Sequence, residues 1–390
     1  MTGRHTLQYA APFRWDFSNP VKLVVGRGCR KELSELLVDK TLLIVTSKRG
    51  RFQLSEDAFL GHILVSNRIH WVDSVKENPG LTDLQTEIDR LHDVKFDAVV
   101  AFGGGSALDA GKALNVALAR DCRKYSLQEL LAGPKHHGSV KPTPLYTVST
   151  TSGTGSEVTP FATVWSHELK KKLSLSGPAV WPTAAFVDSE LTDSVPLLMT
   201  VSTGLDAINQ AAESFWNRNA NPITMGYSIR ALQLSLEALP KLARGQGGRR
   251  ERDQMSEASL LAGLAISHTR TALCHSISYP ITAHFGVPHG LACAFTMPMV
   301  LRRNLEAEDG RFAQAALALT GSSSLDNLVA CFDRLHETLQ VRERVTCHIP
   351  SLEALLALEG EMHTPGRADN NLSGEENLVS ILEEAWRLCQ

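Results

Sequence analysis

The first half of the chain alternates short, uninterrupted apolar runs with stretches of helical pattern, and this alternation constrains the fold more than any other feature. The runs are residues 41–46 (TLLIVT), 98–102 (AVVAF), 145–149 (LYTVS) and 184–188 (AAFVD). Strands that are apolar on both faces are typical of a buried parallel sheet with crossover helices. Residues 81–91 (LTDLQTEIDRL) carry a clear helical stripe. This half therefore predicts an α/β domain with a parallel sheet.

The second half has a different character. After about Leu191 strand-type runs become scarce, and helical patterns such as 225–242 and 252–268 dominate, with a glycine-rich loop at 245–248. A chain of 390 residues is also long for a single compact core. We therefore predict two domains, an α/β domain over residues 1–190 and an all-helical domain over residues 191–390.

Composition excludes several classes of partner and location. The chain is 43% hydrophobic and 21% charged with a formal net charge of −3, which favours neither nucleic acid nor a membrane surface as a partner. Residues 1–20 lack the apolar run of a signal peptide, and no stretch is long enough to span a membrane. The seven cysteines are scattered without CxxC spacing, which predicts reduced thiols in a cytoplasmic protein and argues against a cysteine-built zinc site.

Two polar loops follow predicted strands directly. Residues 103–106 (GGGS) lie between the run at 98–102 and a helical stretch at 107–119, and residues 149–157 (STTSGTGSE) follow another run. Glycines let backbone amides approach a phosphate, and a helix N-terminus adds positive potential. The GxGxxG fingerprint is absent, so either loop alone could be a tight turn or a solvated loop. The two together favour a nucleotide site.

A carboxylate and two imidazoles suggest a metal. Asp206 and Gln210 lie four residues apart on a predicted helix, His275 ends a helical stretch, and His289 lies at a loop-to-helix corner. Such a set is common in catalytic divalent-metal sites that keep an open position. Each histidine taken alone is more readily explained by packing or surface exposure than by metal binding, so spacing alone leaves the metal site open.

Four ordered strings resemble the signatures of the iron-containing, or group III, alcohol dehydrogenases: GGGSALDAGK (103–112), TTSGTGSEVTPFA (150–162), GLDAINQAAES (204–214) and CHSISYPITAHFGVPHG (274–290). The resemblance implies a dinucleotide-binding N-terminal domain, a metal-binding helical domain, NADH or NADPH, one Fe²⁺ or Zn²⁺ ion, and a homodimer. It assigns the pyrophosphate loop to Gly103, Gly104, Gly105, Ser106 and Asp109, the nucleotide contacts to Thr150, Thr151, Thr154 and Thr159, and the metal ligands to Asp206, His275 and His289.

The chain departs from the family pattern at two positions near the metal. Gln210 stands where the family usually has a histidine ligand, and a neutral amide oxygen binds a metal weakly or through water. Tyr279 stands where the family often has a histidine associated with proton relay. His284 is the nearest remaining imidazole, so Tyr279 and His284 are the catalytic candidates.

The segment predicted to face the adenosine ribose of the cofactor also departs from the family pattern. The family often closes the strand matching residues 42–46 with an acidic residue that binds the adenosine ribose. Here that position is Ser47, followed by Lys48 and Arg49. Loss of the carboxylate and gain of two cations favour NADPH, or tolerance of both cofactors.

The resemblance extends to a substrate. Gln210, with the contexts WNRNANP at 216–222 and ISYP at 277–280, looks most like the phosphonoacetaldehyde reductases, which reduce phosphonoacetaldehyde to 2-hydroxyethylphosphonate. A dianionic substrate requires nearby cations. The candidates are Arg270, five residues before His275, then Lys172, and also Arg218 and His284. Lys172, whose loop follows the threonine-rich cofactor stretch, is a cofactor-binding candidate as well.

Three alternatives remain at this level. The enzyme could reduce another small aldehyde or a 2-oxo acid, or it could catalyse a non-redox reaction in the manner of dehydroquinate synthase. An inactive binding homologue is the third, and only Gln210 favours it. In the preferred interpretation the metal polarises the carbonyl, the nicotinamide delivers hydride, and Tyr279 or His284 assists protonation.

Overall fold

The computed structural model describes residues 14–374 and 377–387, and the chain divides into two compact units. One unit is Asn19–Val195, and the other contains the chain from Pro196 onward together with the described residues before Asn19. The division lies five residues after the boundary proposed from the sequence. Most of residues 1–20, in which the sequence shows no signal-peptide pattern, lie outside the described residues, and so does Cys389.

The first unit is built on a six-stranded sheet that is parallel throughout, with strand order β1-β8-β5-β4-β2-β3. Its strands are β1 (Lys22–Val25), β2 (Thr41–Val45), β3 (Arg68–Val72), β4 (Ala98–Gly103), β5 (Leu145–Ser149) and β8 (Ala184–Val187). The predicted parallel sheet is confirmed. The four apolar runs form its four central strands, and the two unpredicted strands are its edges.

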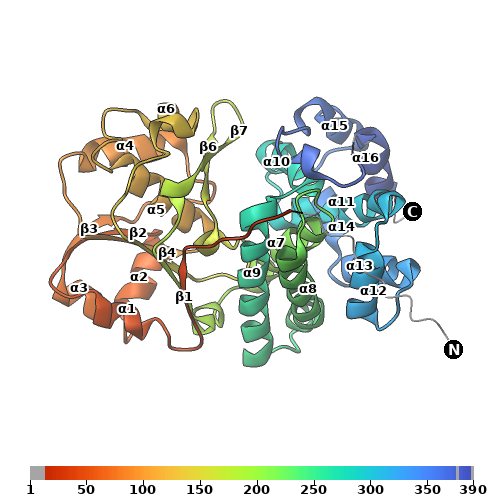
Figure 1. The fold of residues 1–390 in the computed structure, drawn as a ribbon, viewed down its shortest axis with the longest axis horizontal. Coiled ribbons are helices and arrows are strands. Elements are labelled where there is room, and N and C mark those ends of the chain that lie inside the picture. The colour runs from red at the N-terminus through yellow and green to blue at the C-terminus, as the bar shows by residue number, and fades with distance from the viewer. Residues whose placement is uncertain (1–13, 375–376, 388–390) are drawn as a thin grey trace. The chain divides into compact units, whose positions relative to one another are not determined.

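Helices cover both faces of this sheet (Figure 1). One face carries α4 (Leu81–Leu91), α5 (Gly105–Ala117) and α6 (Leu127–Leu131), and the other carries α1 (Lys31–Leu36), α2 (Lys48–Glu56) and α3 (Gly61–Ser66). Because successive strand residues point to opposite faces, Leu43 packs with the α4 side while its neighbour Leu42 packs with the α1 side. This two-sided burial explains the continuous apolar runs.

A two-stranded antiparallel sheet, β6 (Phe161–Ser166) and β7 (Lys171–Ser176), also belongs to this unit. The sequence does not predict it, because β7 is mostly half-buried or exposed and lacks an apolar run. Lys172 therefore lies on a strand, paired with Trp165, and the assignment of this residue to a loop is wrong.

The second unit is helical, as predicted. Its helices are α7 (Leu197–Phe215), α8 (Pro222–Ala243), α9 (Arg249–Thr269), α10 (Leu273–Phe285), α11 (His289–Asn304), α12 (Arg311–Thr320), α13 (Leu325–Thr338), α14 (Val341–Thr346), α15 (Leu352–Leu356) and α16 (Leu378–Arg387). They share one apolar core that includes Phe215, Trp216 and Phe295. Asn221 starts α8 by accepting hydrogen bonds from the amides of Ile223 and Thr224.

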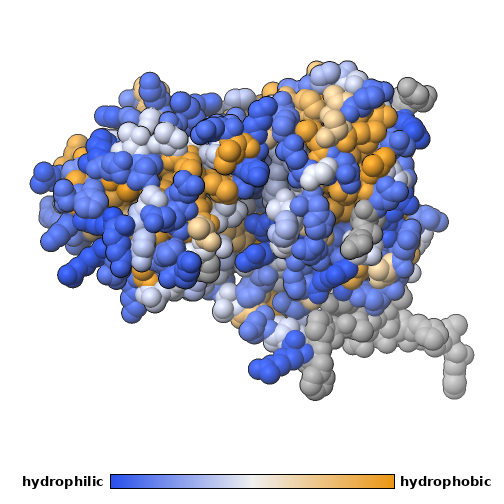
Figure 2. Space-filling view, turned by 90° about the horizontal axis from the view of Figure 1, so that it is seen from above, coloured by the Kyte–Doolittle hydropathy of each residue, from blue (hydrophilic) through white to orange (hydrophobic). Residues whose placement is uncertain are grey.

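The outside of the molecule mixes residue types. Figure 2 shows one face on which hydrophilic residues predominate and hydrophobic residues gather in patches. Among the described residues, none of the helices has the length and apolar character needed to cross a membrane. The described cysteines are free thiols, four of them buried: Cys29, Cys122, Cys274 and Cys293.

Candidate metal centre and cofactor edge

The two polar loops predicted to bind phosphate lie side by side. Strands β4 and β5 are neighbours in the sheet, with Gly103 paired to Ser149, and the amide of Thr150 donates to the carbonyl of Gly103 at 3.0 Å. Both loops therefore leave the sheet at the same carboxyl edge. In doubly wound α/β folds, ligands bind outside that edge.

The glycines of the first loop make room for the threonines of the second. A Cβ at Gly105 would lie 2.5 Å from the methyl of Thr154, and one at Gly104 would lie 3.2 Å from the hydroxyl of Thr151. Helix α5 starts directly after this loop, and its N-cap Gly104 provides no side-chain hydrogen bond. The first amides of α5 are therefore not capped by a side chain, as an anion site at this helix N-terminus requires.

Helix α5 also holds the second loop in place. The carboxylate of Asp109 accepts from the Ser156 hydroxyl at 2.5 Å and from the Thr163 amide at 2.8 Å. Thr159 is 1% exposed, and its hydroxyl binds the ammonium of Lys112 at 3.1 Å. The structure thus places Asp109 and Thr159, both proposed as cofactor residues, in contacts that fasten the loop to the helix.

Ser47 lies at the carboxyl end of β2, the neighbour of β4. It is the N-cap of α2, where its hydroxyl accepts from the amide of Gly50 at 3.0 Å. Lys48 and Arg49 follow in the first turn of the helix, and both are exposed. The serine and the two cations therefore share an edge with the glycine-rich loop.

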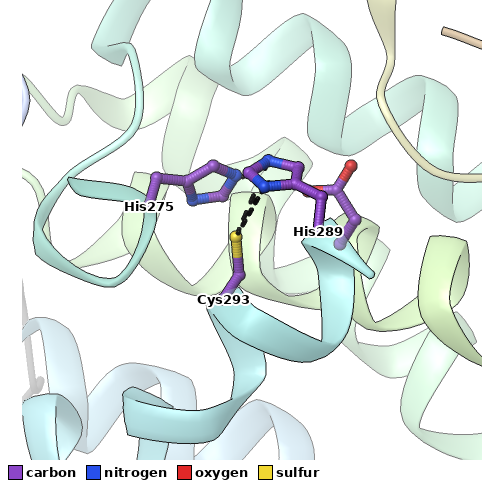
Figure 3. Close-up of side chains that lie close together, drawn as sticks. His275, His289 and Cys293 are labelled. Atoms are coloured by element: carbon purple, nitrogen blue, oxygen red, sulfur yellow. Dashed lines mark hydrogen bonds and ion pairs between the residues drawn. The ribbon is translucent and has the colours of Figure 1, made fainter. Parts of the chain in front are cut away.

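The metal-ligand candidates converge within the helical unit. Asp206 comes from the middle of α7, His275 from the first turn of α10, and His289 is the first residue of α11. With Cys293, they offer four ligand atoms that all lie within 4.8 Å of one another (Figure 3). The sequence places His275 at the end of a helix, which is wrong; it lies near the start of one.

Close packing of α11 against α7 brings these ligands together. A Cβ at Gly290 would collide with the backbone oxygen of Ser202 and lie 3.0 Å from the amide of Asp206. Only glycine therefore fits after His289 without moving one helix away from the other. The His-Gly pair provides a ligand and a close helix contact in consecutive residues.

Glu213, which the sequence analysis does not identify, fixes the orientation of His275. The buried carboxylate accepts from Nδ1 of His275 at 2.6 Å and from the amides of Ala272 and His275 at 2.8 and 3.1 Å. The other ring nitrogen, Nε2, then faces Asp206 at 3.2 Å. A carboxylate behind a histidine ligand is a common support of metal sites. Its position, seven residues after Asp206 on one helix face, is the signal that could have revealed it.

The surroundings of Gln210 indicate whether the residues of this site fit a metal. Its Oε1 is buried and has no hydrogen-bond partner in the described part of the chain. Leaving a buried amide oxygen unpaired costs about 1–3 kcal/mol, which a cation nearby would offset. Because Gln210 lies one helical turn after Asp206, this oxygen is on the ligand face of α7. The residues present therefore fit a divalent metal.

Cys293 is the second residue that the sequence analysis misses. It is fully buried one turn after His289, and its Sγ lies 3.8 and 3.7 Å from Nδ1 and Nε2 of that ring. Burial acts to raise the pKa of the thiol, but the positive charges of His275 and His289 outweigh burial and lower this pKa from 9.0 to about 7. Burial alone would lower the pKa of His275, yet the charges of Cys293 and Glu213 raise it well above its usual range.

The two proton-relay candidates occupy different surroundings. The ring of Tyr279 stacks on that of His289, with centroids 5.9 Å apart and planes inclined by 19°. Nε2 of His284 instead lies 3.1 Å from a carboxylate oxygen of Glu361. Tyr279 is thus stacked on a metal-ligand candidate, while His284 lies within hydrogen-bonding distance of Glu361.

Arg270 lies between α9 and α10 in a rare backbone conformation, with φ +61° and ψ −178°. Arg270 is exposed as a whole residue, and its Nη1 would lie 3.9 Å from a Cβ placed at Gly366. Partial desolvation of the guanidinium and the charge of Arg367 lower the pKa of Arg270. The segment that carries Arg367 is tied to α10, because the amide of Thr364 donates to the hydroxyl of Ser276 at 2.7 Å. Arg270 and Arg367 therefore lie on two segments that meet near the start of the helix that carries His275.

Comparisons with known proteins agree with this geometry. The iron-containing alcohol dehydrogenase profile matches residues 20–189, and the C-terminal profile of the same family matches residues 200–346. A 1,3-propanediol dehydrogenase from Citrobacter freundii is 30% identical over 75% of this chain and 74% of its own length. A phosphonoacetaldehyde reductase from Streptomyces viridochromogenes is 35% identical over 59% of each chain.

Solved structures extend the similarity to the whole fold. A sulfoacetaldehyde reductase from Bifidobacterium kashiwanohense, solved in complex with NAD⁺, superposes with a TM-score of 0.83. It is 26% identical and covers 97% of this chain and 99% of its own. The chain belongs to the iron-containing alcohol dehydrogenase family and is an NAD(P)-dependent oxidoreductase.

Proposed function

We propose that this enzyme reduces a small anionic aldehyde, with phosphonoacetaldehyde as the leading candidate, to the corresponding alcohol. The observation that carries the proposal is the position of two arginines, Arg270 and Arg367, on segments that meet beside the start of α10. Two similar proteins, a phosphonoacetaldehyde reductase and a sulfoacetaldehyde reductase, support it, since both of their substrates are aldehydes with an acidic group. The residues suited to hold a metal favour redox chemistry over an inactive binding homologue.

The site residues have separate tasks in this reaction. A divalent metal would supply Lewis-acid polarisation of the carbonyl, and a nicotinamide cofactor would supply the hydride. Asp206, His275 and His289 would hold the metal, and Glu213 keeps Nε2 of His275 turned toward it. Tyr279, stacked on His289, is the group we assign to protonation of the developing alkoxide.

The anion-binding assignment rests on the cost of the arrangement around Arg270. The charge of Arg367 acts against the charged form of Arg270, and a non-glycine residue held at φ +61° and ψ −178° costs about 1–3 kcal/mol. The backbone is held there by hydrogen bonds, from the Asn217 amide at 3.3 Å and the Thr269 hydroxyl at 2.9 Å to the Arg270 carbonyl. A dianionic phosphonate would relieve the repulsion and accept charge-assisted hydrogen bonds from both groups.

Substrate discrimination tests this proposal. Arg270→Ala and Arg367→Ala should each impair reduction of phosphonoacetaldehyde far more than reduction of propanal. Each charge-assisted contact contributes about 1.5–3 kcal/mol, so the two together correspond to roughly a hundredfold or more in kcat/KM. The measurement is kcat/KM for both aldehydes with the wild-type chain, the two single variants and the double variant.

The controls separate an anion site from a structural role. Arg230→Ala, which removes an exposed arginine paired with Glu257 on the surface, should leave the ratio of the two substrates unchanged. Equal losses with both aldehydes in the Arg270 and Arg367 variants would make these residues structural. A wild-type preference for propanal would overturn the phosphonate assignment and leave the dehydrogenase assignment intact.

We also propose that Ser47 permits NADPH to bind. Ser47→Asp should shift the preference toward NADH by about 1–3 kcal/mol, because a carboxylate repels a 2′-phosphate and accepts hydrogen bonds from a free ribose. Aspartate is as good an N-cap as serine, so α2 should keep its stability. The ratio of kcat/KM for NADPH and NADH measures the effect, with Ser55→Asp near the end of α2 as the control. An unchanged ratio would mean that Ser47 does not face the ribose.

A further inference from the structure

We infer that Cys293 is a ligand of the metal, acting with Asp206, His275 and His289. The inference rests on the proposed metal centre and concerns which atoms form it. In Figure 3 the sulfur of Cys293 projects from α11 toward the imidazole rings of both histidines. Cys293 is 0% exposed, so solvent cannot reach its thiol.

The spacing of the donor atoms fits a four-coordinate metal. Around a tetrahedral zinc with bonds of about 2.0–2.3 Å, neighbouring ligand atoms lie about 3.3–3.8 Å apart. Here Oδ1 of Asp206 and Nε2 of His275 are 3.2 Å apart, and Sγ of Cys293 and Nε2 of His289 are 3.7 Å apart. All four atoms lie within 4.8 Å of one another, so small side-chain adjustments suffice to enclose an ion.

The types of donor atom around the site also favour Cys293 as a ligand. Gln210 offers only a neutral oxygen where the family pattern has an imidazole, which weakens that side of the site. A thiolate at Cys293 restores a strong donor from the opposite helix. Because sulfur ligands favour thiophilic metals, we expect the centre to prefer zinc to iron(II).

Cobalt substitution gives a direct readout of the sulfur bond. The full-length apoprotein would be reconstituted with Co²⁺, and a thiolate ligand would produce a near-ultraviolet charge-transfer band. We expect this band in the wild-type chain and in Cys274→Ser, since Cys274 is also buried on α10 beside His275 but lies outside the ligand group. Cys293→Ser should lose the band and bind metal more weakly by at least about 100-fold.

X-ray absorption of the zinc-loaded wild-type chain keeps the inference testable without any variant. One sulfur neighbour at about 2.3 Å is expected beside nitrogen and oxygen neighbours at about 2.0–2.2 Å. Stoichiometric zinc or cobalt with only nitrogen and oxygen neighbours would overturn the role of Cys293 and leave the metal centre standing. A wild-type chain that binds neither metal would overturn both.

Discussion

Replacing His275 by alanine should lower kcat by at least about 1,000-fold and reduce the bound metal to a small fraction of one ion per chain. The factor corresponds to about 4 kcal/mol of transition-state stabilisation, within the range that a Lewis-acid metal supplies. His275 is 3% exposed, Glu213 orients it through Nδ1, and its Nε2 faces Asp206, so this nitrogen is positioned to bind a metal ion. Steady-state kinetics and elemental analysis of the purified protein measure the two effects.

Two comparisons make this result specific. His284→Ala alters the same helix at a position paired with Glu361 and should keep its metal. Gln210→Ala should be milder than His275→Ala, because a neutral amide oxygen is the weakest donor of the site. Near-normal activity of His275→Ala with a normal melting temperature would show that the proposed centre is wrong. A loss in Gln210→Ala as severe as in His275→Ala would make the amide oxygen an essential ligand.

The part of the fold that sequence reasoning predicts best is the part buried on both sides. The central strands β2, β4, β5 and β8 lie between two helical layers, so nearly every residue in them is apolar. The edge strand β1 is exposed at three of its four positions, and β3 has one exposed and three half-buried positions, so neither strand is a continuous buried run. Helix α4 coincides with the predicted residues 81–91 because its buried stripe, Leu84, Ile88 and Leu91, packs into one core together with α5 and α6.

The site shows what motif and spacing arguments omit. Asp206, His275 and His289 follow from recognisable motifs, and the structure brings them together. Cys293 follows His289 by one turn, but its scattered relation to the other cysteines conceals its position beside two imidazoles. The spacing of residues also cannot reveal why the loop at residues 103–106 must contain glycines. Gly105 is required partly because Thr154, from a different loop, occupies the space where its side chain would lie.

Loss of the buried ammonium at Lys112 should destabilise the first unit by about 3–5 kcal/mol, the range for removing one partner of a buried charged network. Lys112 is 0% exposed on α5 and donates to the Ser156 hydroxyl, the Thr159 carbonyl and the Phe161 carbonyl, each at 2.9 Å. Burial lowers its pKa to about 8 against the opposing charges of Asp109 and Glu157, so the cation predominates at pH 7.

Lys112→Met tests this role, because methionine fills similar volume but donates no hydrogen bond. The buried oxygens that accept from Lys112 would lose their donor, and the buried carboxyl group of Glu157 would lose the positive charge of this lysine. Urea unfolding at pH 7 followed by tryptophan fluorescence measures the change, and Lys31→Met on the exposed surface of α1 should stay within about 0.5 kcal/mol of wild type.

Because the contacts of Lys112 hold the threonine-rich loop against α5, dinucleotide affinity should fall together with stability. A variant within about 1 kcal/mol of wild type that binds cofactor normally would mean that the loop is held by other contacts, chiefly those of Asp109.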